Sequence, residues 1–169
     1  SLKTRSETRM FRRRFYSSVT DKEWNDWQWQ VRNRIRTYER LSRVLTLSPD
    51  ETIVNHGIQL PLSITPYYLS LVSPHDPGQP IRRSVIPSIR EWIKMPCESD
   101  DPLGEDNQSP VPGLVHRYPD RVLFLLLDFC STYCRYCTRS RMVGRGGIHA
   151  SRARWEKAID YIEQTPTVR

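Results

Sequence analysis

The sequence lacks a hydrophobic run long enough to cross a membrane, and it contains little cysteine. No stretch approaches the ~18 consecutive apolar residues of a transmembrane helix, and no charged-then-apolar secretion signal opens the chain. The four cysteines among 169 residues are not spread out like the disulfide framework of a small secreted protein. These absences favour a cytoplasmic protein without a membrane partner, in which clustered thiols serve a metal or redox function.

The net charge of +7 belongs to one end of the sequence. Residues 1–43 hold 12 Lys and Arg against 5 Asp and Glu, whereas the remaining residues hold 14 of each kind. A basic stretch such as Phe11–Phe15 ("FRRRF") can bind nucleic acid or an acidic membrane. Charge runs are weak indicators, however, so a solvated or subunit-contacting arm is favoured and a nucleic-acid partner is not expected.

Local signals predict a basic arm and a helical region in residues 1–97. A capping box at Thr20–Glu23 precedes apolar residues that recur every three or four positions up to Leu45, which predicts one amphipathic helix. The remaining signals are helix starts at Ser48–Pro49, Thr65–Pro66 and Pro87, and a stop at Gly57.

The pattern changes at residues 98–120. Five acidic residues lie between Glu98 and Asp106, and four prolines interrupt or follow them. This composition predicts a long connecting segment without a regular element.

Residues 121–169 are predicted to begin a parallel α/β domain. The run "RVLFLLLDF" (Arg121–Phe129) is apolar on both faces, which is typical of a buried parallel strand. A helix is predicted from Ser151, with its buried side formed by Trp155, Ala158, Ile159 and Ile162. A single parallel strand needs neighbours, so the sequence is interpreted as the N-terminal part of a larger protein.

Three of the four cysteines fall within eight residues, in "DFCSTYCRYCTRSR". Cys130, Cys134 and Cys137 could bind zinc with His149 as a fourth ligand. They could instead hold three irons of a [4Fe–4S] cluster and leave the fourth iron open to a substrate. Simple packing of three thiols at this spacing is disfavoured, because reactivity usually decides where cysteine is placed.

Four blocks of the sequence resemble the lysine 2,3-aminomutase family: "EWNDWQWQVRNRI", "ITPYYLSL", "EDNQSPVPGLVHRYPDRVLFL" and "CSTYCRYCTRSR". The spacing C-x3-C-x2-C, with the aromatic Tyr136 before the last cysteine, is similar to the signature of the radical S-adenosylmethionine enzymes. That motif alone indicates only the superfamily. The resemblance to the narrower family runs from about Trp24 to Arg169.

The resemblance implies an isomerase that moves an amino group from the α- to the β-carbon of a small-molecule amino acid, with L-lysine as the expected substrate. It implies a [4Fe–4S] cluster, S-adenosylmethionine and pyridoxal 5′-phosphate as cofactors. It also implies a reducing protein such as flavodoxin or ferredoxin, and assembly as a homo-oligomer. The implied fold class is α/β: an N-terminal helical region precedes the first βα unit of a partial (βα)6 barrel, truncated at Arg169.

The resemblance also assigns roles to individual residues. Tyr136 would lie near the adenine of S-adenosylmethionine, or else simply pack against the loop. Arg139 would bind the substrate carboxylate, for which a planar guanidinium is well suited; the alternative is a surface arginine. The cluster ligands would be Cys130, Cys134 and Cys137. The residues expected to bind the pyridoxal phosphate are Arg117, Tyr118 and Arg121, although these arginines could instead neutralise the acidic segment.

Other interpretations remain open from the sequence. The intact protein could act on glutamate or arginine, or modify a lysine of a translation factor. A zinc or nucleic-acid binding module is a more distant alternative. The lysine that binds pyridoxal phosphate and the residues that select the substrate side chain are expected beyond Arg169, so the chain alone is expected to be inactive.

Overall fold

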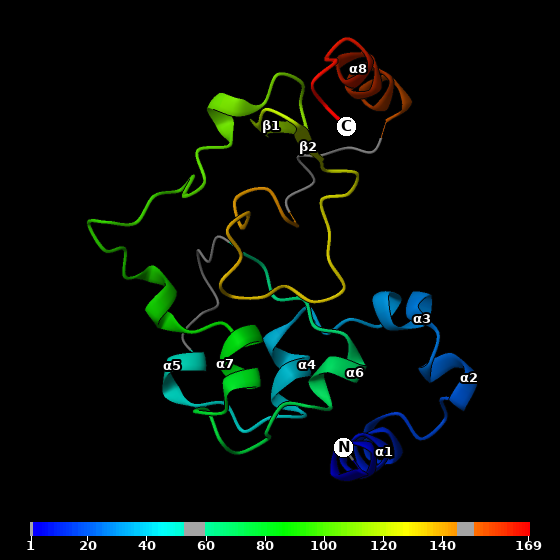
Figure 1. Cartoon of the computed structure of the whole chain (residues 1–169). Coiled ribbons are helices and arrows are strands. Elements are labelled where there is room, and N and C mark those ends of the chain that lie inside the picture. Colours follow the sequence, from blue (N-terminus) through cyan, green and yellow to red (C-terminus); the bar gives the residue numbers. More distant parts are fainter. Residues whose placement is uncertain (1, 53–59, 145–150) are drawn as a thin grey trace. The chain divides into compact units, whose positions relative to one another are not determined.

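The computed structural model describes residues 2–52, 60–144 and 151–169 (Figure 1). The predicted helix stop at Gly57 lies outside these residues. The described elements, in chain order, are α1 (Leu2–Phe15), α2 (Asp21–Trp24), α3 (Trp27–Arg32), α4 (Tyr38–Ser42), α5 (Pro49–Thr52), α6 (Pro66–Leu69), α7 (Pro80–Val85), the 3₁₀ helices η1 (Ile89–Trp92) and η2 (Asp106–Gln108), strands β1 (Leu114–Tyr118) and β2 (Arg121–Phe124), and α8 (Arg152–Glu163).

The chain forms two compact units. The first comprises Ser1–Lys94 together with Ser131–Cys137, and the second comprises Met95–Cys130 together with Thr138–Arg169. Helices α1 to α7 lie in the first unit, and the two strands and α8 lie in the second. The described chain therefore combines helices with a small two-stranded sheet. None of the described helices has both the length and the apolar character needed to cross a bilayer.

The single helix predicted from Thr20 to Leu45 is wrong, because local caps divide this stretch into α2, α3 and α4. The capping box at Thr20 is present, but the Asp26 carboxylate accepts hydrogen bonds from the amides of Gln28 and Trp29 and starts a new helix. Ile35 then pairs with Ile64 in an antiparallel bridge. Cap and bridge hydrogen bonds compete with continued helix here and outweigh the apolar periodicity.

The core of the first unit gathers apolar residues from four separated stretches. Leu41 of α4, Leu69 of α6 and Val85 of α7 are almost fully buried, and these three helices lie side by side in Figure 1. The full cluster comprises Ile35, Leu41, Leu45, Leu62, Ile64, Leu69, Val72, Val85 and Ile86. The predicted apolar face is thus only partly buried, since Trp27 on the same predicted face is 69% exposed.

Proline-based helix starts are mostly confirmed. Helices α5 and α6 begin at Pro49 and Pro66. Proline is favoured at the first position of a helix, because the N–H that it lacks would have no partner within the helix there. The helix expected after Pro87 is shorter than predicted: it is the single 3₁₀ turn η1, whose Ser88 amide donates to Glu91. Helix α7, which begins at Pro80, was not predicted.

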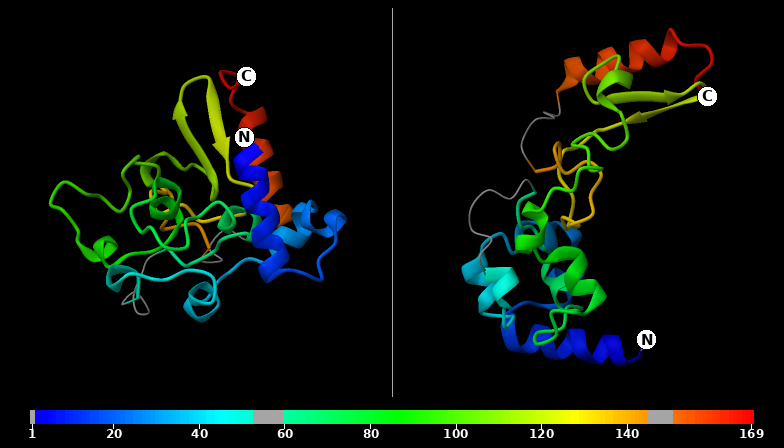
Figure 2. Two further views of the ribbon diagram at one scale, coloured as in Figure 1. Left: turned by 90° about the horizontal axis from the view of Figure 1, so that it is seen from below. Right: turned by 90° about the vertical axis from the view of Figure 1, so that its left-hand side faces the viewer.

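The predicted buried parallel strand is also wrong. Strand β2 pairs antiparallel with β1, with Leu114 opposite Phe124 and Val115 opposite Leu123. The end of the supposedly irregular segment 98–120 supplies β1, because Pro119 and Asp120 form a two-residue connection that lets the chain fold back on itself. Figure 2 shows this hairpin with α8 beside it.

Polar contacts fasten α8 to the hairpin. Ser151 caps the helix as predicted, and its side chain accepts a hydrogen bond from the amide of Arg154. The Arg154 guanidinium donates to the carbonyl oxygens of Leu125 (2.8 Å) and Leu126 (3.2 Å). Tyr161 shares a 2.7 Å hydrogen bond with His116 Nδ1 of β1. Of the residues predicted on the buried side of α8, Ala158 is fully buried, whereas Trp155 and Ile159 are exposed.

Gly113 makes the close approach of Arg154 possible. Its φ of +81° lies in the left-handed region, and a Cβ at this position would lie 2.4 Å from Nη1 of Arg154. We expect Gly113→Ala to destabilise the protein by about 1–3 kcal/mol, from backbone strain and from displacement of the guanidinium. Chemical denaturation of the intact protein measures this loss.

Gly104→Ala is the matched control for that substitution. Gly104 also has a positive φ, +63°, but nothing lies within 4 Å of an added Cβ. It should therefore show the backbone cost alone. Equal losses for the two variants would contradict a steric role for the contact between Gly113 and Arg154.

Candidate functional site

The segment that carries the three cysteines, residues 130–137, is called the cysteine loop. It is attached to the helices of the first unit, the helical unit, through residues that lie between the cysteines. The amide of Tyr133 donates to the carbonyl oxygen of Ser63 at 2.8 Å, and the Tyr133 side chain is buried. The amide of Thr65 donates to the Thr132 hydroxyl at 3.3 Å. The helical region thus provides hydrogen-bonding partners for residues 132 and 133, and so orients the loop in which Cys134 follows.

Arg135 makes the most extensive contacts of this loop. Its Nε donates to Glu91 at 2.9 Å and its Nη2 donates to the other oxygen of the same carboxylate. Nη1 and Nη2 also donate to the carbonyl oxygens of Pro61 (3.2 Å) and Leu60 (2.9 Å). The side chain is only 6% exposed. A planar guanidinium can satisfy this set of acceptors, and an ammonium group cannot reach all of them.

No local sequence pattern marks Arg135 as a functional residue. Its acidic partner Glu91 stands 44 positions earlier in η1, so no local spacing links the two. The amide of Arg135 is fixed as well, donating to the carbonyl oxygen of Ser84 at 2.8 Å. The signal that could have indicated its importance is its position between Cys134 and Cys137, where an arginine must be either exposed or specifically paired.

The cysteines themselves divide between the two units. Cys134 and Cys137 belong to the first unit and are partly exposed, and a turn links them through a 3.2 Å hydrogen bond from the Cys137 amide to the Cys134 carbonyl oxygen. Cys130 belongs to the second unit and is exposed. Among residues 2–52, 60–144 and 151–169, no group of three or more His, Cys, Asp or Glu is arranged to hold a metal. His149, the predicted fourth zinc ligand, lies outside them.

Tyr136, the residue expected near S-adenosylmethionine, is 74% exposed. The alternative that it packs against the loop is therefore not favoured by the structure. Its ring is accessible to a ligand, and contact with the adenine stays a prediction.

Arg139 is paired with an acidic residue of its own chain. Its Nε donates to Glu105 at 3.1 Å and its Nη2 donates to the other oxygen of that carboxylate. The Glu105 side chain is 6% exposed and that of Arg139 is 30% exposed. Arg139 is thus a partly buried, oriented guanidinium, not a free surface arginine.

Arg141, two residues later, binds the same acidic segment. It donates to Asp106 at 2.7 Å and to Asp101 at 2.9 Å. A hydrogen bond from the backbone amide of Asp106 lowers the pKa of Asp101, and the contact with Arg141 lowers it further. The acidic part of segment 98–120 is therefore fastened to residues 139 and 141 of the second unit.

The three residues predicted to bind a phosphate lie at the tip of the hairpin. Tyr118 and Arg121 face each other across the turn, and the Arg121 guanidinium lies 5.8 Å from the centre of the Tyr118 ring. Arg121 pairs with Asp120, and hydrogen bonding to that carboxylate raises the pKa of Arg121. Arg117 donates to the carbonyl oxygen of Leu103. The alternative role, neutralisation of segment 98–120, holds for Arg121 at Asp120, whereas Glu105, Asp101 and Asp106 of the same segment pair with Arg139 and Arg141.

Comparison with curated proteins identifies clear relatives. The L-lysine 2,3-aminomutase of Clostridium subterminale is 49% identical over 164 residues, which cover 95% of this chain and 39% of the relative. The L-lysine 2,3-aminomutase of Fusobacterium nucleatum is 49% identical over 160 residues, covering 94% of this chain and 38% of the relative. The chain belongs to the lysine 2,3-aminomutase family. A relative named for another amino acid also matches the chain. The glutamate 2,3-aminomutase of Clostridioides difficile is 38% identical over 152 residues, which cover 89% of this chain and 36% of the relative.

The resemblance inferred from the four sequence blocks is thereby confirmed. The chain spans about two-fifths of the length of these family members, which agrees with the expectation that it is the N-terminal part of a longer protein. No protein-family model matches the chain.

Proposed function

We propose that the intact protein is a radical S-adenosylmethionine enzyme that moves the amino group of an amino acid from the α- to the β-carbon, with L-lysine as the first candidate substrate. The cysteine loop carries this proposal. It combines three thiols at a spacing typical of an open [4Fe–4S] cluster with a specific attachment to the helical unit through Arg135. The names of the lysine-specific relatives support the substrate.

The proposed reaction is an isomerisation. A hydrogen leaves the β-carbon, the amino group moves from the α- to the β-carbon, and a hydrogen returns to the α-carbon, so no atom is gained or lost. When bound, the cluster, S-adenosylmethionine and pyridoxal phosphate would supply the one-electron and radical chemistry that amino-acid side chains cannot perform. The residues of this chain bind and orient the reactants.

The donor set of the loop fits an iron–sulfur cluster. Thiolates are the usual protein ligands of such clusters, and three of them leave one iron without a protein ligand. Cys130 is exposed and Cys134 and Cys137 are partly exposed, so burial closes off none of the three cysteines. Cys130, Cys134 and Cys137 would hold the cluster, while Arg135 and its partner Glu91 keep residues 131–137 in place.

Basic residues elsewhere in the chain would bind the anionic groups. Arg139 would bind the substrate carboxylate through guanidinium edges that Glu105 does not occupy. Arg117, Tyr118 and Arg121, at the tip of the hairpin, would contact the phosphate of pyridoxal phosphate, and the exposed Tyr136 would contact the adenine.

Further parts of the intact protein and its partners would complete the proposed enzyme. Leu126 and Leu127 are 51% and 55% exposed, and further strands of a partial (βα)6 barrel would cover them. A reducing protein such as flavodoxin or ferredoxin would deliver the electron, and the family resemblance supports a homo-oligomer. Glutamate is the second candidate substrate, because a glutamate 2,3-aminomutase also matches the chain.

We expect electron paramagnetic resonance of the reconstituted, reduced intact protein to show a [4Fe–4S]⁺ signal that changes when S-adenosylmethionine is added. Serine substitution of Cys130, Cys134 or Cys137 should abolish this signal, because each removes a thiolate ligand. Cys97→Ser is the control, since Cys97 is an exposed cysteine outside the loop, and it should leave the signal unchanged. Recovery of zinc without labile sulfide would contradict the proposal.

A further inference from the structure

We infer that Glu105 is the positioning residue for Arg139, and thereby sets the affinity of the protein for the carboxylate group of its substrate. This inference rests on the proposed function. The Glu105 carboxylate contacts Nε and Nη2 of Arg139, so it occupies one edge of the guanidinium in a two-point contact. A two-point contact fixes the plane of the guanidinium as well as its position.

Glu105 leaves part of the arginine available. A guanidinium has five N–H donors, and two of them meet Glu105. The edge that includes Nη1 is not used in this contact and can present two parallel N–H groups to another carboxylate. Arg139 is 30% exposed, whereas Glu105 is only 6% exposed, so the accessible part of the pair belongs to the arginine.

Displacement of Glu105 by the substrate is disfavoured by its burial. In the part of the chain that the structure describes, Arg139 is the cation paired with Glu105. A buried carboxylate that loses such a contact is strongly destabilised. The substrate therefore binds beside Glu105 on the same guanidinium, and does not replace it. Glu105 acts through Arg139 and has no contact with the substrate.

The backbone around Glu105 is held independently of Arg139. The Glu105 carbonyl oxygen accepts hydrogen bonds from the Ser109 hydroxyl (2.7 Å) and the Gln108 amide (3.1 Å). The neighbouring Asp106 binds Arg141 at 2.7 Å. Two arginines thus bind the segment with different tasks: Arg141 fastens the segment through Asp101 and Asp106, and Arg139 is oriented by Glu105.

This division of tasks gives a matched pair of variants, Glu105→Gln and Asp106→Asn. Both remove one negative charge from the same segment without changing side-chain size. In the intact holoenzyme we expect Glu105→Gln to weaken binding of the amino acid by about ten-fold or more, because a charge-assisted contact that orients Arg139 is lost. Asp106→Asn should change this affinity by less than about two-fold, because Arg141 keeps Asp101 as a partner.

The decisive readout compares the amino acid with its carboxamide, measured both by calorimetry and by KM. The wild type should prefer the acid over the amide, and Glu105→Gln should reduce that preference by about ten-fold while leaving S-adenosylmethionine affinity unchanged. Glu105→Asp, which keeps the charge on a shorter side chain, should give an intermediate preference. An unchanged preference in Glu105→Gln, or equal effects of Glu105→Gln and Asp106→Asn, would overturn the inference.

The same experiment separates this inference from the proposed function. Amino-group migration by the wild type tests the function, whereas the preference between acid and amide tests Glu105. Calorimetry gives that preference whether or not migration is detected. A wild type that binds acid and amide equally would overturn the role of Glu105 even if migration occurred.

Discussion

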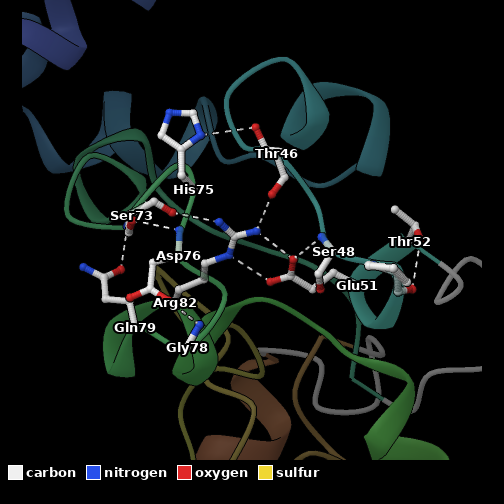
Figure 3. A network of polar contacts seen from close by, with 11 residues as sticks. Thr46, Ser48, Glu51, Thr52, Ser73, His75, Asp76, Gly78, Gln79 and Arg82 are labelled. Atoms are coloured by element: carbon white, nitrogen blue, oxygen red, sulfur yellow. Dashed lines mark hydrogen bonds and ion pairs between the residues drawn. The ribbon is translucent and has the colours of Figure 1, made fainter.

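Replacing Arg82 by methionine is expected to destabilise the protein by about 3–5 kcal/mol, because it leaves a buried carboxylate without its cation. Arg82 is fully buried, and its guanidinium donates to both oxygens of Glu51, at 2.9 and 2.7 Å. It also donates to the carbonyl oxygens of Thr46 and Ser73 (Figure 3). Methionine retains an apolar stem but supplies none of these hydrogen bonds, so three acceptor residues lose a donor at once.

This network connects segments that are distant in the sequence. Arg82 lies in α7, Glu51 in α5, Thr46 after α4 and Ser73 after α6. The Ser48 amide adds a 2.8 Å hydrogen bond to Glu51. Because the helices involved are only four to six residues long, they are not stable alone, and these contacts hold their ends together.

Arg83→Met is the matched control for Arg82→Met. Arg83 is the next residue of the same helix and is exposed, so its loss should change the free energy of unfolding by no more than about 0.5 kcal/mol. Urea denaturation of the intact proteins measures both changes. Similar losses in the two variants would show that the buried pair contributes no more than a surface arginine.

The pH dependence of stability follows from the same pair. Burial raises the pKa of Glu51, but hydrogen bonds from Arg82 and from the Ser48 amide outweigh burial and leave this pKa below its ordinary value. The stabilisation is therefore complete above the ordinary glutamate pKa and is lost as pH falls through the lowered value of the folded state. In Arg82→Met the buried Glu51 loses the Arg82 contacts that lower its pKa, so it takes up a proton above the ordinary glutamate pKa of about 4.3. We therefore expect the difference in unfolding free energy between wild type and Arg82→Met to begin to shrink above this pH on acidification, and to shrink further as pH falls through the lowered wild-type value.

Features encoded in a few neighbouring residues could be predicted from the sequence. The capping box at Thr20, the proline starts at Pro49 and Pro66 and the Ser151 cap are confirmed, because each depends on hydrogen bonds or steric fit within one helical turn. The length of the helix after Thr20 could not be predicted this way. Helix α2 ends at Trp24, and the cap at Asp26 starts a new helix in spite of the apolar spacing that continues through both.

Features that depend on distant partners could not be predicted. The hairpin is an exception, because β1 directly precedes β2: there the apolar run from Arg121 is equally consistent with a parallel strand, and the polar, proline-containing composition of residues 98–120 obscures β1. Arg82 and Glu51 are 31 positions apart, and no spacing rule links them. For the candidate site, the family resemblance indicates the cysteines and Arg139 but not Glu105 or Arg135, because Glu105 contacts Arg139 and Glu91 contacts Arg135 only in the folded chain.

Replacing Arg135 by methionine is expected to lower the affinity of the cysteine loop for the proposed [4Fe–4S] cluster by about ten-fold or more, as for other residues that orient metal ligands without binding the metal. The side chain lies between Cys134 and Cys137 in the sequence, is 6% exposed, and donates to Glu91 and to the carbonyl oxygens of Leu60 and Pro61. Its loss leaves a carboxylate and two carbonyl oxygens without their donor and releases the loop from η1.

The measurement is the amount of iron and labile sulfide per chain after anaerobic reconstitution of the intact protein. Arg135→Lys should restore little of the iron and sulfide content, because a single ammonium cannot reach the Glu91 carboxylate and both carbonyl groups together. Arg90→Met is the control, since Arg90 is an exposed arginine beside Glu91 that pairs only with Asp50 in the described contacts. Unchanged iron and sulfide in Arg135→Met would show that the loop holds its own geometry. Loss of iron and sulfide in Arg135→Met but not in Arg90→Met would establish that the helical region, through one buried guanidinium, holds the cysteine loop in a conformation that binds the proposed cluster.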